Sequence, residues 1–153
     1  MSITKHIKFM NLVLEEAKKA GQNDEVPVGA LVVSEKGKIL SSSHNQVIGL
    51  CDPTAHAEII AIRQAASKIK NYRLLNTTLY VTVEPCIMCM GAIIHTRIST
   101  VVFGTFDPKW GGAGSLYNLA TDSRFNHLPE IIPGVLEDEC RELMQDFFRS
   151  KRI

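Results

Sequence analysis

The sequence lacks the long apolar segments that would place it in or across a membrane. No apolar run approaches the ~20 residues that a spanning helix needs. The amino-terminal stretch from Met1 to His6 carries charge within an amphipathic pattern, and it has no apolar stretch like that of a secretory signal peptide. We therefore expect a cytoplasmic protein with no membrane partner.

The sequence also lacks a strong excess of either charge. Its 17 basic and 16 acidic side chains give a formal net charge of +1 with histidine counted as neutral. A protein that binds nucleic acid usually shows a basic excess, so any such contact must be local. The one basic cluster lies at residues 149–152, and composition alone explains it as a solvated helix end.

No internal repeat, linker or low-complexity tract divides the chain. Its 153 residues, 45% of them hydrophobic, fit one domain around one core, so we expect residues 1–153 to form a single domain. Glycines at positions 104, 111, 112 and 114 mark a loop whose length and composition favour a binding role.

Apolar residues at helical spacing predict helices over residues 7–20 and 135–148, and start signals at Asp52-Pro53 and Pro85 predict helices over residues 52–68 and 85–95. In the second of these, Asp52 is the predicted N-cap and Pro53 the first helical residue. Apolar, β-branched runs predict a hairpin of residues 28–33 and 38–43, and further strands over 79–83, 100–104 and 131–133. Alternating strands and helices favour parallel pairing, and the hairpin makes the sheet mixed. The expected fold class is α/β, a three-layer α/β/α sandwich with a central mixed sheet of about five strands.

Cysteine is scarce, and two of the four cysteines stand at metal-ligand spacing. Cys86 and Cys89 occur in Pro85-Cys86-Ile87-Met88-Cys89. A cytosolic chain rarely forms disulfides, so we expect Cys51 and Cys140 to be buried small hydrophobic residues.

The segment His56-Ala57-Glu58 completes a zinc motif with these thiols. One imidazole and two thiolates suit a catalytic zinc, which keeps its fourth position for water, and Glu58 can carry the proton of that water. The pattern H-x-E…P-C-x-x-C is the signature of zinc deaminases. We therefore predict one Zn²⁺ per chain on His56, Cys86 and Cys89, with Glu58 as the catalytic residue.

Two points about this motif stay open in the sequence. A closed, structural zinc with Cys51 as fourth ligand is an alternative, although it leaves Glu58 unexplained. Residues two apart lie about 200° apart on a regular helix, so Glu58 can reach the metal beside His56 only if the first helical turn is irregular. Both motif segments begin predicted helices, whose free N–H groups favour thiolate over thiol.

With these residues placed, the chain resembles the cytidine deaminase-like superfamily and, within it, the bacterial tRNA adenosine deaminases. The resemblance covers nearly the whole length, and the stretches after residue 97 point to the tRNA branch. Beyond the zinc motif it includes residues 25–30, Asn45, residues 52–58, 79–86, 91–92, 97–98, 102–104, 107–109, 114–116 and 126–127, and Phe147-Phe148-Arg149.

The resemblance implies a homodimer that deaminates the wobble adenosine of a tRNA anticodon stem-loop to inosine. Matched by position, Asn45 would hydrogen-bond the target nucleotide, while Val28 and Ala30 would line the base pocket. The remaining expected RNA contacts are those of Asp107 and Lys109 with the anticodon-loop backbone or sugars, and those of Phe148, Arg149 and Arg152 with flanking nucleotides.

Simpler roles stay open for several of these residues. Asn45 could cap a turn, Asp107 could start one, and Phe148 could belong to the core. The chain also departs from the family pattern at Met90, Trp110 and Gly112. Two other functions stay open: deamination of a free base or nucleoside, guanine or cytosine, and a zinc-stabilised binding module without catalysis.

Overall fold

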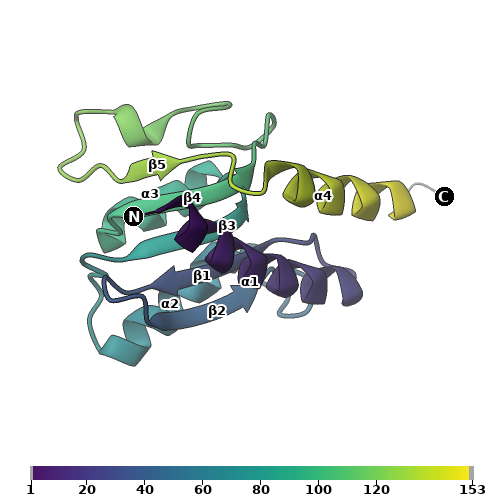
Figure 1. Cartoon of the computed structure of the whole chain (residues 1–153), viewed down its shortest axis with the longest axis horizontal. Helices are drawn as coiled ribbons and strands as arrows, with labels where there is room; N and C mark the ends of the chain where they lie inside the picture. The colour runs from purple at the N-terminus through teal and green to yellow at the C-terminus, as the bar shows by residue number, and fades with distance from the viewer. Residues whose placement is uncertain (1, 152–153) are drawn as a thin grey trace.

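A five-stranded mixed β-sheet forms the centre of the structure, a computed structural model that describes residues 2–151 (Figure 1). Its strands are, in chain order, β1 (Gly29–Val33), β2 (Ile39–His44), β3 (Thr78–Val83), β4 (Thr100–Thr105) and β5 (Glu130–Ile132). Their spatial order is β2-β1-β3-β4-β5. β1 is antiparallel to both of its neighbours, whereas β3, β4 and β5 run parallel. The predicted mixed sheet is confirmed.

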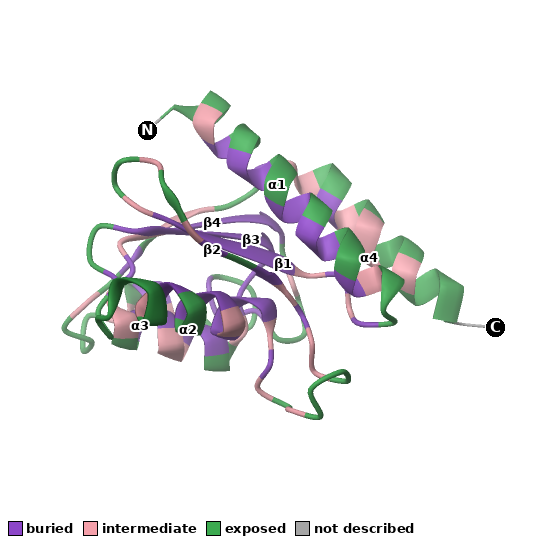
Figure 2. Cartoon of the chain, turned by 90° about the horizontal axis from the view of Figure 1, so that it is seen from below, coloured by how far each residue is buried: buried purple, intermediate pink, exposed green. Residues whose placement is uncertain are grey.

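Helices cover both faces of this sheet (Figure 2). α1 (Ile3–Gln22) and α4 (Glu137–Lys151) lie on one face, and α2 (Ala57–Ile69) and α3 (Ile87–Thr96) lie on the other. A short 3-10 helix, η1 (Leu119–Thr121), lies in the connection from β4 to β5. This is the predicted α/β/α sandwich. Among residues 2–151, no helix is both long and apolar enough to cross a bilayer.

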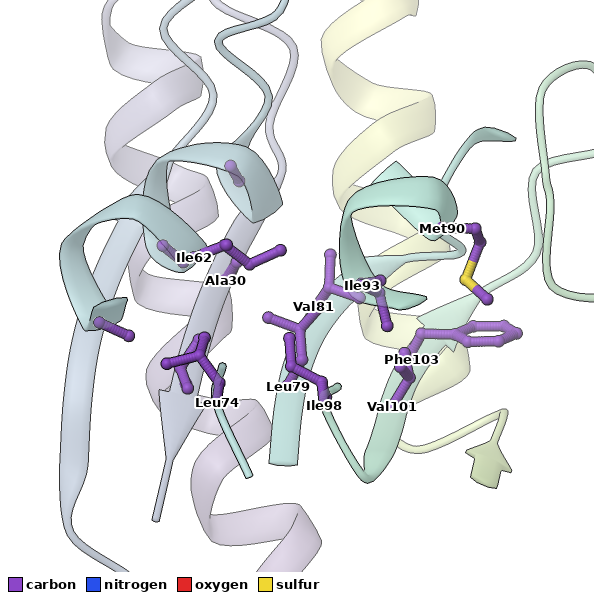
Figure 3. Packing of buried hydrophobic residues seen from close by; sticks show 14 of the residues in the cluster. Ala30, Ile62, Leu74, Leu79, Val81, Met90, Ile93, Ile98, Val101 and Phe103 are labelled. Carbon is purple, nitrogen blue, oxygen red and sulfur yellow. The ribbon is translucent and has the colours of Figure 1, made fainter. Parts of the chain in front are cut away.

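Each face of the sheet has its own apolar core. Met10 and Val13 of α1 pack against Leu31 of β1 on one side. On the other side, Ile62 of α2 and Ile93 of α3 join the cluster shown in Figure 3. β1 and β3 are buried along their whole length because helices cover both of their faces.

All four helices begin at residues other than those predicted, and α3 begins at Ile87 rather than residue 85 because Cys86 is its N-cap. α1 begins at Ile3 rather than residue 7, because the Ser2 side chain accepts a hydrogen bond from the backbone N–H of Lys5 and caps the helix (3.4 Å). α4 begins at Glu137 rather than residue 135, because Leu136 has a left-handed backbone with φ 55°. On α4, Cys140 is buried as predicted.

The prediction of a helix from Asp52 is wrong. The carboxylate of Asp52 accepts hydrogen bonds from the backbone N–H and the hydroxyl of Thr54 (2.9 and 2.7 Å), so this segment forms a turn. α2 begins only at Ala57, with His56 as its N-cap. Cys51, in the preceding turn, is exposed with φ 50°, so the expectation that it is buried is also wrong.

Candidate active site

The three predicted zinc ligands lie together between the N-termini of α2 and α3. The Nδ1 atom of His56 is 3.6 Å from the Sγ of Cys86 and 3.5 Å from the Sγ of Cys89. The donor atoms of the three residues all lie within 4.8 Å of one another. His56 is the N-cap of α2 and Cys86 is the N-cap of α3, and neither side chain makes a capping hydrogen bond. Both side chains are therefore available to a common partner.

This donor set fits a zinc ion. Tetrahedral coordination with Zn–S near 2.3 Å and Zn–N near 2.1 Å requires sulfur and nitrogen ligands about 3.6 Å apart. The two observed sulfur–nitrogen separations are 3.6 and 3.5 Å. Cys51 is exposed and is not part of the cluster within residues 2–151, so the arrangement offers three protein ligands rather than a closed set of four. Three ligands are the number typical of catalytic zinc.

The three ligands compete with one another for protons. Hydrogen bonding from the Cys89 thiol lowers the pKa of the Cys86 thiol to about 4, although burial acts in the opposite direction. The contact with Cys86, reinforced by burial, raises the pKa of Cys89. Hydrogen bonding to Cys86 likewise raises the pKa of His56. Metal ligands bind in their deprotonated forms, so a cation that replaced the shared protons would relieve this competition.

Glu58 lies beside the ligands as the second residue of α2. Its side chain is buried, with 4% of the residue exposed, and it interacts with the thiol of Cys89. Burial raises the pKa of the Glu58 carboxyl to about 7, while its own backbone N–H and the charge of His56 act to lower it. The chain thus holds a carboxyl group in a water-poor position next to three metal-binding atoms.

Hydrogen bonds from β2 fix the start of α2. The hydroxyls of Ser41 and Ser43 donate to the backbone carbonyls of Ala61 (2.7 Å) and Ala57 (2.9 Å). The backbone N–H of Gln46 donates to the carbonyl of Ala55 (3.0 Å), next to His56. The end of β2 and the metal cluster are therefore joined through the backbone.

The residues predicted to hold the base lie at this end of β2. The backbone N–H of Asn45 donates to the carbonyl of Val28 (3.0 Å), which places these two residues side by side. Asn45 is buried, with 7% of the residue exposed. Val28 is partly buried, whereas Ala30 is fully buried in the core. A contact of Ala30 with a base stays a prediction.

The loop after β4 lies against the other side of the cluster. The backbone N–H of Gly112 donates to the carbonyl of Pro85 (2.8 Å), and Gly111 forms a β-bridge with Cys86. Asp107 begins this loop, and one of its carboxylate oxygens accepts from the backbone N–H groups of Lys109 and Trp110 (3.1 and 3.2 Å). Asp107 therefore does form a turn.

The remaining predicted RNA contacts are exposed. Lys109 lies at the surface of the same loop, and Phe148 and Arg149 lie on the exposed side of α4. Phe148 is 42% exposed, so it is not a core residue. Arg149 pairs with Asp146 at 3.2 Å. Arg152 lies outside the described residues.

The three departures from the family pattern have clear places in the fold, and Gly112 is the loop residue that donates to Pro85. Met90 is fully buried in the core beneath α3. Trp110 is 66% exposed and lies in the loop between Asp107 and Gly111.

Sequence reasoning missed two buried carboxylates that organise the loops around the site. Glu25 accepts hydrogen bonds from the backbone N–H groups of Ile48 and Gly49 (3.0 and 2.7 Å), in the loop between β2 and α2. Glu84 does the same for the loop after β4. Both residues are almost fully buried, with 3% and 2% exposed.

Comparison with known proteins places this geometry in a family. Residues 3–105 match the family model described as the cytidine and deoxycytidylate deaminase zinc-binding region. The chain is 49% identical to the tRNA-specific adenosine deaminase of Haemophilus influenzae over 145 residues, which are 95% of this chain and 84% of the relative. It is 45% identical to the enzyme of the same name from Bacillus subtilis, over 94% of this chain and 89% of the relative.

A solved structure from studies of A-to-I editing by tRNA:A34 deaminases at the wobble position of transfer RNA superposes with a TM-score of 0.86. It shares 41% sequence identity over 89% of this chain and 98% of its own. The chain therefore belongs to the family of tRNA-specific adenosine deaminases, which carries the zinc-binding region of the cytidine and deoxycytidylate deaminases.

Proposed function

We propose that this protein is a zinc-dependent hydrolase that converts the wobble adenosine of a tRNA anticodon to inosine. The observation that carries the proposal is the cluster of one imidazole and two thiols, with the buried Glu58 beside it, in a chain 49% identical to a tRNA-specific adenosine deaminase. Water replaces the amino group at C6 of adenine, so the products are inosine and ammonia.

His56, Cys86 and Cys89 would hold one zinc ion per chain. Zinc bound there supplies Lewis-acid chemistry that makes water an effective nucleophile near neutral pH. Glu58 is the group in this chain that can move the protons. It accepts one proton from the attacking water and delivers it to N1 of the adenine ring, then takes the second proton from the hydroxyl formed at C6 and delivers it to the departing amine, so that a C=O bond forms as the C–N bond breaks.

The target base would bind between Asn45 and the metal cluster. A side-chain amide can both donate and accept hydrogen bonds, so Asn45, next to Val28 at the end of β2, is suited to hydrogen-bond the target nucleotide. Val28, joined to Asn45 through the backbone, supplies apolar surface for the base. An anticodon-loop nucleotide is unpaired and costs little to extrude, which helps to confine the reaction to that position.

Asp107 and Lys109 would contact the RNA backbone around the extruded nucleotide. One carboxylate oxygen of Asp107 is used by the turn, and the other accepts no hydrogen bond within residues 2–151. That oxygen could accept a hydrogen bond from a ribose 2′-hydroxyl, which DNA lacks. Phe148 and Arg149, together with Arg152, would meet flanking nucleotides. We also propose that residues 1–153 form one domain, that it acts as a homodimer and that it works in the cytoplasm.

The test compares inosine formation from matched RNA and DNA anticodon stem-loops with ammonia release from free adenosine, cytidine and guanine. We expect the RNA stem-loop to be strongly preferred, and Asp107→Asn to weaken the preference for RNA over DNA more than it slows turnover. Equal rates on RNA, DNA and free adenosine would favour a free-base deaminase instead. Bound zinc with no turnover on any of these substrates would favour a binding module.

A further inference from the structure

Glu84 is a buried carboxyl group that accepts four hydrogen bonds from one loop. It follows β3 directly, and only 2% of the residue is exposed. Its Oε1 atom accepts from the backbone N–H of Asp107 (3.0 Å) and from the hydroxyl of Ser115. Its Oε2 atom accepts from the backbone N–H groups of Ala113 and Ser115 (both 3.0 Å). Both oxygens thus bind the loop of residues 107–115, which we call the substrate loop.

The substrate loop is built closely around this carboxylate. A Cβ atom on Gly111 would lie 2.3 Å from the carboxyl carbon of Glu84, so a larger residue there would displace the carboxyl group from its present place. The loop also binds the backbone next to the metal ligand, through the hydrogen bond from Gly112 to Pro85 and the bridge between Gly111 and Cys86. A single short segment, residues 84–86, therefore holds both the substrate loop and one zinc ligand.

We infer that Glu84 is a positioning residue. It fixes where the predicted RNA contacts of the substrate loop lie relative to the metal cluster. The inference rests on the proposed function, and it adds a residue to which no binding role has been assigned. Glu84 has almost no exposed surface with which to contact RNA. It would act through Asp107, whose backbone N–H it holds at 3.0 Å, and so fix where that side chain meets the nucleic acid.

The chemistry at this position calls for a carboxylate rather than an amide. All four hydrogen bonds are donated to Glu84, so both of its oxygens act as acceptors, whereas glutamine offers one accepting oxygen and one donating NH₂ group. In Glu84→Gln the amide oxygen can keep the two N–H groups at the Oε2 position. The NH₂ group then stands at the Oε1 position. The Ser115 hydroxyl can rotate to accept a hydrogen bond from this NH₂ group, but the backbone N–H of Asp107 can only donate and so loses its acceptor. The substitution should therefore release Asp107 selectively.

The first test examines the free protein and does not depend on activity. Amide hydrogen exchange should become at least about tenfold faster at Asp107 in Glu84→Gln, because that N–H loses its acceptor, with little change in the sheet. Glu25→Gln is the matched control, since Glu25 is also a buried carboxylate that accepts two backbone N–H groups, but in the other loop. Unchanged exchange at Asp107 in Glu84→Gln would overturn the inference, whatever the protein's substrate is.

The second test is a double-mutant cycle with Asp107→Asn on an RNA anticodon stem-loop. If Glu84 acts through Asp107, the KM of Glu84→Gln should rise by about tenfold with kcat and zinc content nearly unchanged, and the double variant should be no worse than the poorer single variant. Glu25→Gln should combine additively with Asp107→Asn. Additive effects of Glu84→Gln and Asp107→Asn, or loss of zinc in Glu84→Gln, would overturn the positioning role. An inactive wild type would instead count against the proposed function.

Discussion

Replacing Glu58 by glutamine isolates proton transfer from metal binding and from folding. The amide has nearly the same size as the carboxyl, and burial already disfavours the charged form of Glu58, so the neutral side chain should fit the same space. None of the three metal ligands is altered. We therefore expect Glu58→Gln to fold normally and to keep its zinc.

The expected loss is in the chemical step. Within residues 2–151, the ionisable groups that influence the three ligands are the ligands themselves and Glu58, so no second base is placed to take over. One general acid–base group contributes about 10²–10⁴ in rate, and Glu58 would serve at more than one proton transfer. We expect kcat to fall by about 10³ or more, which corresponds to about 4 kcal/mol of transition-state stabilisation.

Single-turnover inosine formation from an anticodon stem-loop measures this loss, alongside zinc analysis and thermal unfolding. Glu35→Gln, on an exposed turn of the β1–β2 hairpin, is the control and should behave as wild type. Near-normal turnover of a zinc-loaded Glu58→Gln variant would refute the proton-transfer role. Loss of zinc from that variant would show instead that Glu58 belongs to the metal site.

Three further outcomes follow from the same structure. Cys86→Ala and Cys89→Ala should each lose zinc because each leaves only two ligands, and metal analysis showing full occupancy in both would contradict the assignment. Truncation after Phe147 should raise KM for the stem-loop and make binding less dependent on salt concentration, since fewer phosphates are neutralised. If the slope of log K against log salt were unchanged, the end of α4 would not belong to the RNA interface. Phe103→Ala, at a fully buried site in the α2–α3 core, should lower the free energy of unfolding by about 3–5 kcal/mol in chemical denaturation, and a loss below about 1 kcal/mol would mean that this core is loosely packed.

The sheet and its helices could be predicted because burial leaves local patterns. β3 and β4 read as apolar runs, and α1 repeats its apolar residues at helical spacing. The spatial order of the strands was harder to predict, because none of the sequence patterns used above indicates that β1 lies between β2 and β3. The contrast between Leu31-Val32-Val33, buried throughout, and the half-exposed β2 carries that information, because only a central strand needs two apolar faces.

The metal ligands could also be predicted, whereas the residues that organise the surrounding loops could not. Glu25 and Glu84 are charged, and charged residues are ordinarily exposed. Their hydrogen-bond partners are 23 to 31 residues away in the sequence, so no local pattern connects them. One residue in the sequence does reflect the arrangement around Glu84, the glycine at position 111. The reason for a glycine there becomes evident only in the structure, where the Glu84 carboxylate occupies the space that a side chain would need.

The wrong start predicted for α2 bears directly on how the motif works. In a helix that began at Pro53, His56 and Glu58 would point about 200° apart and could not both face Cys89. The turn at Asp52 delays the helix, so His56 keeps an extended backbone (φ −67°, ψ 152°) and Glu58 falls in the first turn. A late helix start therefore lets three consecutive residues supply both a metal ligand and a proton carrier.

The same construction recurs at α3, where Cys86 is the N-cap with an extended backbone (φ −74°, ψ 176°) and Cys89 is the third helical residue. N-cap side chains usually accept hydrogen bonds from the free N–H groups of the first turn, and neither His56 nor Cys86 does so. Those groups keep a partial positive charge at both helix ends, which favours thiolate and carboxylate over their protonated forms. Two uncapped helix starts thus favour the anionic states that zinc binding by Cys86 and Cys89, and proton uptake by Glu58, require.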